Sequence, residues 1–309
     1  MSGKNENARL FGTDRILPPG WPRALAASVV ILFVGLVWAL MRQIPSEPMY
    51  RGKALTLWLR TYAPSSSSGL HSQEWNEADD AVRHLGTNCI PTLLHMIRGK
   101  DSKLKLRLVA LARKQRLIRI HFVSAAQRNV EASRAFIALG DMARDAVPAL
   151  VQMYHDDITA DSQSAIEDAL AWIGPAAKPA IPLLLGAATN SNPRVRANAL
   201  WALGEIHSEP PLCVPELIHA LGDSDDWARL SAAHALGMFG TNAKSAVPSL
   251  TELTNTRWLF DGMASMRVQV MLEAKKALNK IDPHTVSPTS EAFPDFGIPA
   301  ADSPLSTKE

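Results

Sequence analysis

Between residues 74 and 281, apolar residues recur at helical spacing, and short stretches with glycine and proline interrupt them regularly. The first stripe consists of Ala78, Ala81, Val82 and Leu85, which follow the i, i+3, i+4, i+7 pattern of one helix face. Later helices in this block are rich in alanine, which lets neighbouring helices approach closely. The pattern predicts an all-α region built from packed amphipathic helices.

A ten-residue motif returns along this block and ends in proline each time, over residues 139–148, 173–182, 206–215 and 239–248. The prolines are therefore 33 or 34 residues apart, and a shortened copy covers 85–91. A fixed period of this length indicates a repeat solenoid. Within the motif, glycine should end the first helix of a repeat, and proline should begin the second.

The copies differ in ways that bear on the turns. Asn192 before Pro193 reads as a helix N-cap, and Asp225 takes the matching place one period later. His207 replaces the motif glycine in one copy, where we expect nearby Gly204 to relieve the turn. The final helix is predicted from Val268 to Ile281. The two cysteines, Cys89 and Cys213, occupy equivalent small-residue positions of distant repeats and are predicted to be core residues without a disulfide.

Ahead of the repeats, residues 24–41 form an apolar run without a charge, after a polar segment at 1–23. As a helix this run would span about 27 Å, close to the hydrocarbon thickness of a bilayer. A buried helix or a cleaved signal peptide would be the alternatives, but the run is long for a signal and no small-x-small cleavage site follows. We therefore predict an uncleaved transmembrane helix.

The charges around this run leave its orientation nearly open, because four basic residues lie on each side. We expect a single-pass protein of the bacterial inner membrane, and we favour the N-terminus inside and the solenoid outside. Residues 42–73 read as a juxtamembrane segment, with an amphipathic helix over 49–62 and a Ser-rich linker. The apolar face of that helix would lie on the membrane or, as we prefer, cap the solenoid. Residues 282–309 contain five prolines and are predicted to be a disordered tail.

The charge composition suggests a candidate binding surface in one stretch of the sequence only. The chain has 32 basic and 30 acidic residues, a balance that does not suggest a nucleic-acid-binding protein. The stretch 98–119, however, contains nine Lys or Arg and one acidic residue, within an insertion of about 24 residues in the repeat pattern. Lys103, Arg107 and Lys114 share a helix face there. They are either solvated or bind anionic lipid headgroups or an acidic partner.

The motif I/L-G-x-x-A-x-x-A-V/I-P-x-L, preceded by Val-Arg-x-x-Ala, resembles HEAT repeats, and more narrowly the short HEAT-like repeats of phycobilisome bilin lyases. The resemblance covers about 74–281 and implies an α-solenoid of about five helix pairs. Such repeats serve many functions, so the resemblance says little about activity. It leaves open an accessory enzyme of the bilin lyase type.

Catalytic chemistry is not indicated. The sequence lacks G-x-S-x-G, G-x-G-x-x-G, P-loop and C-x-x-C motifs. It also lacks the His-Glu pairs of the iron-binding deoxyhypusine hydroxylases, a second HEAT-type enzyme family. His207, His219 and His234 have no carboxylates at metal-site spacing, so we predict no metal and no cofactor. No small-molecule substrate is suggested.

The second helices of the repeats were expected to line a concave wall. Polar residues four and eight positions after each motif proline would be exposed there, and the candidate partner-binding residues are Gln152, Asp156, Asn190, His219, Asp223 and Glu252. The sequence therefore predicts a non-catalytic, membrane-tethered scaffold that binds an unknown protein. An anionic-lipid-surface module using 98–119 is the further alternative.

Overall fold

The computed structural model describes residues 35, 47–62, 73–114, 122–156, 158–254 and 264–284. The chain separates into two units, Met1–Glu47 and Pro48–Glu309, and the helices and strands below lie in the second. Apart from Gly35, the predicted membrane helix at 24–41 lies outside the described residues, as do linker residues 63–72 and tail residues 285–309.

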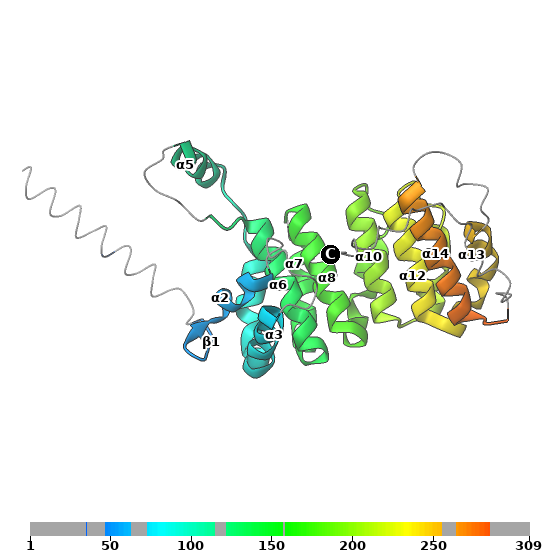
Figure 1. The fold of residues 1–309 in the computed structure, drawn as a ribbon, viewed down its shortest axis with the longest axis horizontal. Coiled ribbons are helices and arrows are strands. Elements are labelled where there is room, and N and C mark those ends of the chain that lie inside the picture. Colours follow the sequence, from blue (N-terminus) through cyan, green and yellow to red (C-terminus); the bar gives the residue numbers. More distant parts are fainter. Residues whose placement is uncertain are drawn as a thin grey trace, which may run out of the picture. The chain divides into compact units, whose positions relative to one another are not determined.

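Five helix pairs and one closing helix follow a small N-terminal element (Figure 1). The first helices of the pairs are α3 (Gln73–Leu85), α6 (Ala125–Leu139), α8 (Ala160–Ile173), α10 (Pro193–Ile206) and α12 (Asp226–Phe239). The second helices are α4 (Ile90–Arg98), α7 (Val147–His155), α9 (Ile181–Ala187), α11 (Pro210–Ala220) and α13 (Val247–Thr254). The closing helix is α14 (Ala264–Ile281), and α5 (Lys103–Lys114) is inserted after the first pair. The predicted helical solenoid of about five pairs is thus observed.

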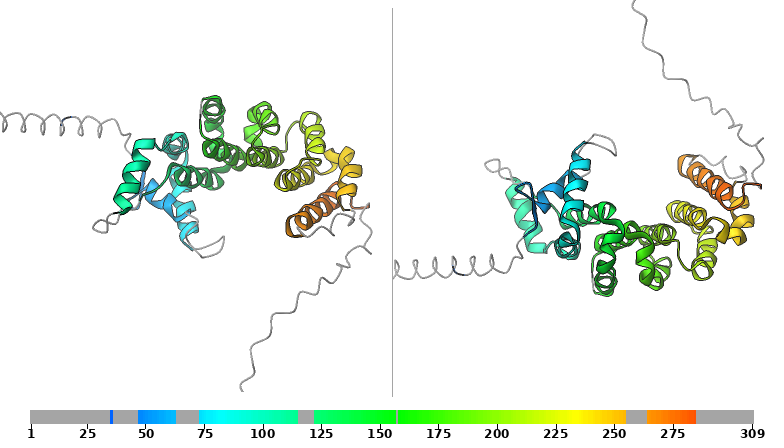
Figure 2. Two further views of the ribbon diagram at one scale, coloured as in Figure 1. Left: turned by 90° about the horizontal axis from the view of Figure 1, so that it is seen from above. Right: turned by 90° about the horizontal axis from the view of Figure 1, so that it is seen from below.

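Each long first helix packs on the next, so that α6, α8, α10, α12 and α14 form one continuous layer (Figure 2). The short second helices pack on this layer but contact one another little. They do not form the continuous wall that we expected from the sequence. Each second helix packs mainly on the first helix of the following repeat instead.

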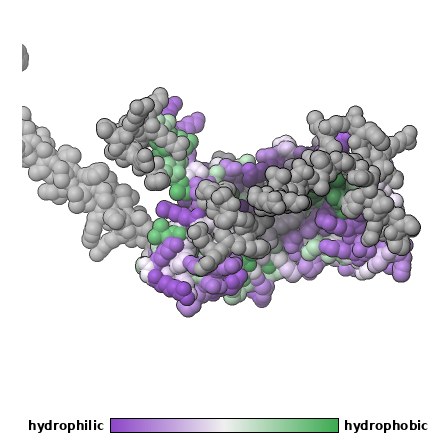
Figure 3. Space-filling model, in the orientation of Figure 1, coloured by the Kyte–Doolittle hydropathy of each residue, from purple (hydrophilic) through white to green (hydrophobic). Residues whose placement is uncertain are grey.

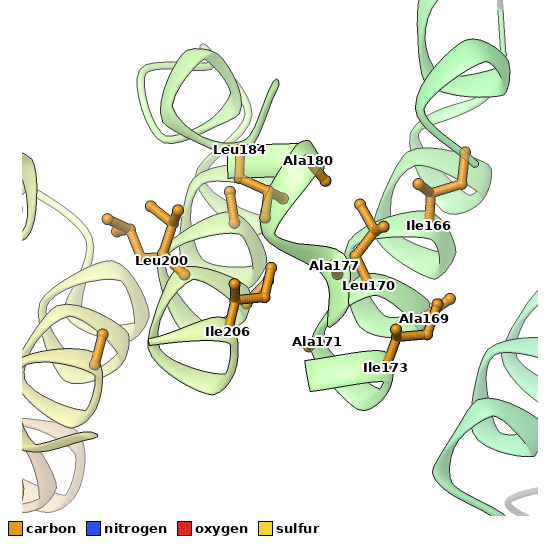
Figure 4. Packing of buried hydrophobic residues seen from close by; sticks show 14 of the residues in the cluster. Ile166, Ala169, Leu170, Ala171, Ile173, Ala177, Ala180, Leu184, Leu200 and Ile206 are labelled. Carbon is orange, nitrogen blue, oxygen red and sulfur yellow. The ribbon is translucent and has the colours of Figure 1, made fainter. Parts of the chain in front are cut away.

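The core runs through all the repeats and consists mostly of alanine, leucine and isoleucine. Around the centre, Ile166, Leu170 and Ile173 of α8 point toward the helices beside them, and Leu184, Leu200 and Ile206 fill the next layer (Figure 4). Ala177 and Ala180 of the connecting 3₁₀ turn η4 (Gly174–Ala180) are fully buried. The alanines of the motif are therefore packing residues. Cys89 and Cys213 are likewise buried and unpaired, as predicted.

The N-terminal element corrects one prediction. Residues 49–62 do not form one helix: strands β1 (Met49–Tyr50) and β2 (Lys53–Ala54) make a hairpin, and α2 covers only Leu55–Leu59. Arg51 and Gly52 turn the hairpin with φ of 49° and 74°, values that a helix cannot contain. Leu55, Leu59 and Tyr62 are buried against α3 and α6, so this element caps the first repeat.

Helix starts and ends follow simple local chemistry. Asn192 and Asp225 accept hydrogen bonds from the first backbone amides of α10 and α12, as predicted for N-caps. Gly86, Gly140, Gly174 and Gly240 end the other first helices with φ between 48° and 70°. His207 ends α10 in the left-handed αL region, with φ of 32° and ψ of 41°, whereas Gly140, Gly174 and Gly240 combine a positive φ with ψ between −131° and −142°. Gly204 does not relieve this turn, because it lies inside α10 against α12.

Replacing His207 with glycine should raise the free energy of unfolding by about 1 kcal/mol. Glycine adopts left-handed backbone angles without the steric cost that a side chain imposes, although its greater freedom in the unfolded chain offsets part of the gain. Urea denaturation of the two proteins would measure the difference. His207→Ala, which keeps the strain and removes the ring, should not be more stable than the parent. Equal stabilisation by both substitutions would contradict this explanation.

One described stretch, Ala160–Ala187, is long and apolar enough by composition to cross a membrane, with a mean hydropathy of 1.3. It is not one helix. Gly174, with φ of 70°, separates α8 from η4 and α9, and α8 is packed between α6 and α10. Its apolar character is that of a solenoid core.

Buried polar side chains gather in α6 and α8. They are Asn129, Glu131, Ser133, Ser162, Ser164 and Glu167. Tyr154 Oη of α7 donates a hydrogen bond of 2.7 Å to Glu167 Oε1, while Glu167 Oε2 has no hydrogen-bond partner among the described residues. Burial raises the pKa of Glu167 to about 9, so the side chain is neutral at pH 7.

Candidate functional site

The edge of the solenoid where second helices lead into first helices contains an arginine–aspartate pair that joins two repeats. Arg196 of α10 donates through Nε and Nη2 to the two carboxylate oxygens of Asp223, at 2.8 and 2.7 Å. Asp223 lies in the loop that leads from α11 into α12, the first helix of the following repeat. Hydrogen bonding to Arg196 lowers the pKa of Asp223, and the same contact raises the pKa of Arg196. Such a bidentate ion pair fixes the spacing of neighbouring repeats.

One period later, Arg229 of α12 has a different environment. Its Nη1 donates to the backbone oxygen of Asp223 at 2.6 Å, and it forms an ion pair with Asp226 of its own helix. The position that corresponds to Asp223 in the next repeat is Thr256, which carries no charge and lies outside the described residues. Burial, and then the nearby charge of Arg267, lower the pKa of Arg229. Two arginines thus approach each other at the last repeat boundary.

A groove of about 540 Å³ opens beside these arginines, between α11 and α13. Ile218, Leu253 and Val270 supply part of its apolar lining. Arg229, Arg267, Asp223, Glu252 and His219 surround that lining. Among the described residues, Arg267 forms no ion pair. An apolar depression with a few polar groups at its rim is the usual form of a binding site.

The structure brings three of the six predicted partner-binding residues to this groove: His219, Asp223 and Glu252. Asp223 is half-buried and already bound to Arg196, whereas His219 and Glu252 are exposed at the rim. Gln152, Asp156 and Asn190 lie along earlier repeats and do not line it. Asp156 pairs with Arg98, and Asn190 Oδ1 accepts from the backbone amide of Asn192 at 2.9 Å.

Sequence reasoning missed the two arginines and the apolar residues of the groove. Arg229 occupies the arginine position that precedes the repeat motif, and Arg267 follows a stretch where the period is interrupted. The useful signal was the exchange of Asp223 for Thr256 at equivalent positions. It indicates that the arginine of that repeat lacks the acidic partner found one repeat earlier.

A second polar cluster joins three first helices. His234 of α12 lies between Glu205 of α10 and Glu273 of α14, with nitrogen–oxygen distances of 3.1 and 3.2 Å. Hydrogen bonding to Glu205, helped by Glu273, raises the pKa of His234. The two carboxylates approach opposite ring nitrogens, an arrangement that favours the protonated form of the imidazole. In the part of the chain that the structure describes, no group of three His, Cys, Asp or Glu is arranged to hold a metal ion.

Comparisons with known proteins agree with the repeat architecture. The family described as HEAT repeats matches residues 181–261. The sequence has no significant match among curated proteins. Among solved structures, the chain is similar to a designed armadillo repeat protein, YIII(Dq.V1)4CPAF, in complex with the peptide (KR)4, with 14% identity and a TM-score of 0.43 over 74% of this chain and 99% of that chain.

Two engineered proteins are also similar. One has 18% identity and a TM-score of 0.41 over 74% of this chain and 96% of that one. The other has 20% identity and a TM-score of 0.40 over 76% of this chain and 100% of that one. The match to HEAT repeats thus covers residues 181–261, and the function of the chain has to be argued from its own residues.

Proposed function

We propose that the chain is a non-catalytic scaffold, held at a membrane, that binds a protein through the groove between α11 and α13. The observation that supports this most directly is the composition of the groove. Ile218, Leu253 and Val270 offer an apolar floor, and Arg267 offers donors with no ion-pair partner among the described residues. A segment with an aliphatic side chain and a nearby acceptor would satisfy both.

The groove suits an extended or helical segment better than a reacting small molecule. Its charged groups, Arg229, Arg267, Asp223 and Glu252, are nearly balanced and lie around the apolar floor. They do not form a nucleophile beside a base, which nucleophilic catalysis requires. Apolar contact at the centre with polar contacts at the rim is the usual plan of a protein interface.

Photo-cross-linking from the groove would test this proposal. A benzophenone side chain replaces Leu253 in the full chain, and a matched one replaces Met142, an exposed residue on the turn η3 (Gly140–Ala146) of an earlier repeat. We expect a discrete cross-linked protein from position 253 that is absent from position 142. Arg267→Glu should weaken that interaction about tenfold, as expected when one charged contact at an interface is lost. The same products from both positions, or none, would refute the groove.

The membrane tether is the part of the proposal that rests on sequence. Residues 24–41 have the length and composition of a single transmembrane helix. A reporter fused after residue 309 would locate the solenoid, and with it the compartment of the partner. Recovery of the full chain in the soluble fraction would remove the tether and leave the groove untouched.

The alternative of an accessory enzyme of the bilin lyase type rests on the repeat motif alone. It would be supported by a chromophore bound to the purified full chain, detected by visible absorption. We prefer the scaffold because the groove explains residues outside the repeat motif, such as Arg267 and Val270.

A further inference from the structure

Helix α5 stands away from the helical layer. It makes no extended packing contact with another described element, and it projects from the first repeat boundary (Figure 1). Its base is nevertheless fixed. Asp101, just before α5, accepts hydrogen bonds from Lys105 Nζ at 2.9 Å and from the backbone amide of Ala125, at the start of α6, at 2.6 Å. The helix is therefore displayed from a defined point.

The apolar residues of α5 are not covered by the described solenoid. Leu104 and Leu111 are 67% and 62% exposed, although both are large aliphatic residues on a helix. They are seven positions apart, so they lie on the same face. Burial of each leucine would be favourable, so a helix that exposes such a stripe is expected to bind another apolar surface.

The charges of α5 are all of one sign. The helix contains Lys103, Lys105, Arg107, Arg113 and Lys114 and no acidic residue. Lys103 and Arg107 lie directly beside the leucine face, whereas Lys105, on its other side, is hydrogen-bonded to Asp101. Figure 3 shows apolar and polar surface side by side on this helix. This arrangement lets the leucines enter an apolar layer while the long basic side chains extend to anions at its surface.

We infer that α5 is a membrane-surface helix that inserts Leu104 and Leu111 into a bilayer and binds anionic headgroups through Lys103 and Arg107. We favour a bilayer over an acidic protein groove because α5 has only basic charges and exposes large aliphatic residues beside them, which is the composition of a helix that lies in a membrane interface. This role is independent of the protein-binding groove and does not require the tether at 24–41.

The test uses the full chain with Leu111→Cys, labelled with an environment-sensitive fluorophore. The native Cys89 and Cys213 are fully buried, and burial raises the pKa of each thiol to about 11, which protects them from the label. We expect a blue shift of emission with vesicles of phosphatidylcholine and phosphatidylglycerol, and little shift with phosphatidylcholine alone. A label at Met142→Cys, on a turn of the solenoid, should not shift.

Charge reversal separates headgroup binding from general adhesion. Lys103→Glu with Arg107→Glu should lower the ratio of inserted to free helix roughly thirtyfold or more, because each basic residue near an anionic surface contributes about a factor of five. Arg144→Glu with Lys244→Glu makes the same change in net charge on exposed turns of the solenoid and should leave the shift intact. Thermal unfolding by circular dichroism confirms that each variant is folded.

Several outcomes would overturn the inference. They are a label that stays in water on anionic vesicles, an equal shift on both vesicle types, and a shift unaffected by Lys103→Glu with Arg107→Glu. A shift produced by a soluble protein but not by vesicles would overturn it as well. Cross-linking from Leu253 should be unchanged in the charge-reversed variant, so failure here and failure of the groove are distinguishable.

Discussion

Gly204→Ala should lower the free energy of unfolding by about 2–3 kcal/mol, the range expected for overpacking in a well-packed core. An added Cβ at this position would lie 2.6 Å from Ala235 Cα and 2.8 Å from Ala235 Cβ. The obstructing atoms belong largely to the backbone of α12, so a side-chain rotation cannot relieve the clash. The long helices α10 and α12 would have to move apart. Urea denaturation followed by circular dichroism measures the loss.

Two other glycines provide matched controls. A Cβ on Gly237 would meet Ala277 at 3.1 and 3.2 Å, so Gly237→Ala should cost less than Gly204→Ala. A Cβ on Gly186 of α9 would meet nothing within 4 Å, and Gly186→Ala should stabilise by about 0.5–1 kcal/mol because alanine is the better helix former. Three equal effects would show that helix spacing at Gly204 is not limiting.

The solenoid should lose stability as pH rises from about 4 to 9, and Glu167 should be the main cause. The unfolded side chain ionises near pH 4.3, whereas burial raises the pKa in the folded protein to about 9. Between these values the folded state binds more protons than the unfolded state. The stabilising contribution is therefore complete below pH 4 and declines by up to about 1.4 kcal/mol per pH unit until it is lost above pH 9.

Glu167→Gln should remove this slope, since glutamine does not titrate. The free energy of unfolding, measured by urea denaturation at several pH values, would show a flatter profile whatever the variant's stability at any one pH. Burial also raises the pKa of Asp168, to about 6, so a smaller slope should persist up to that pH. Glu252→Gln, at an exposed position, serves as the control and should keep the parent profile. An unchanged slope in Glu167→Gln would place the source elsewhere.

The period of the motif was sufficient to predict the repeat architecture, because each turn depends on few and local requirements. Gly174 and Gly240 need positive φ angles, Asn192 and Asp225 cap helices, and the motif proline lies in the first turn of α4, α7, α9 and α13. The exception is α11, which begins at Pro210 and contains the motif Pro215 in its interior. The hairpin at 49–54 escaped prediction since Leu55, Trp58, Leu59 and Tyr62 have helical spacing. A two-residue turn at Arg51 and Gly52 interrupts the segment before that spacing begins.

The candidate site was only half predictable. Counting from the prolines placed His219, Asp223 and Glu252 on one edge, and the structure gathers them around a groove. Counting could not show that Asp223 is bound to Arg196, because that contact joins residues of different repeats. Arg267 could not be predicted for a related reason. The insertion before α14 shifts this residue out of the 33-residue repeat register. Long-range pairing and broken periodicity are the properties that a one-dimensional pattern does not contain.

The single layer of first helices has a mechanical consequence. Each first helix in this layer, from α6 to α14, packs on the next one along the chain. A force applied between the two ends is therefore transmitted through every helix boundary in series. The most compliant boundary then determines the extension. Glu167 of α8 is hydrogen-bonded to Tyr154 of α7, and its ionisation weakens the contact between these helices as pH rises. Under load, the solenoid would thus yield more readily at this contact in an alkaline compartment than in an acidic one.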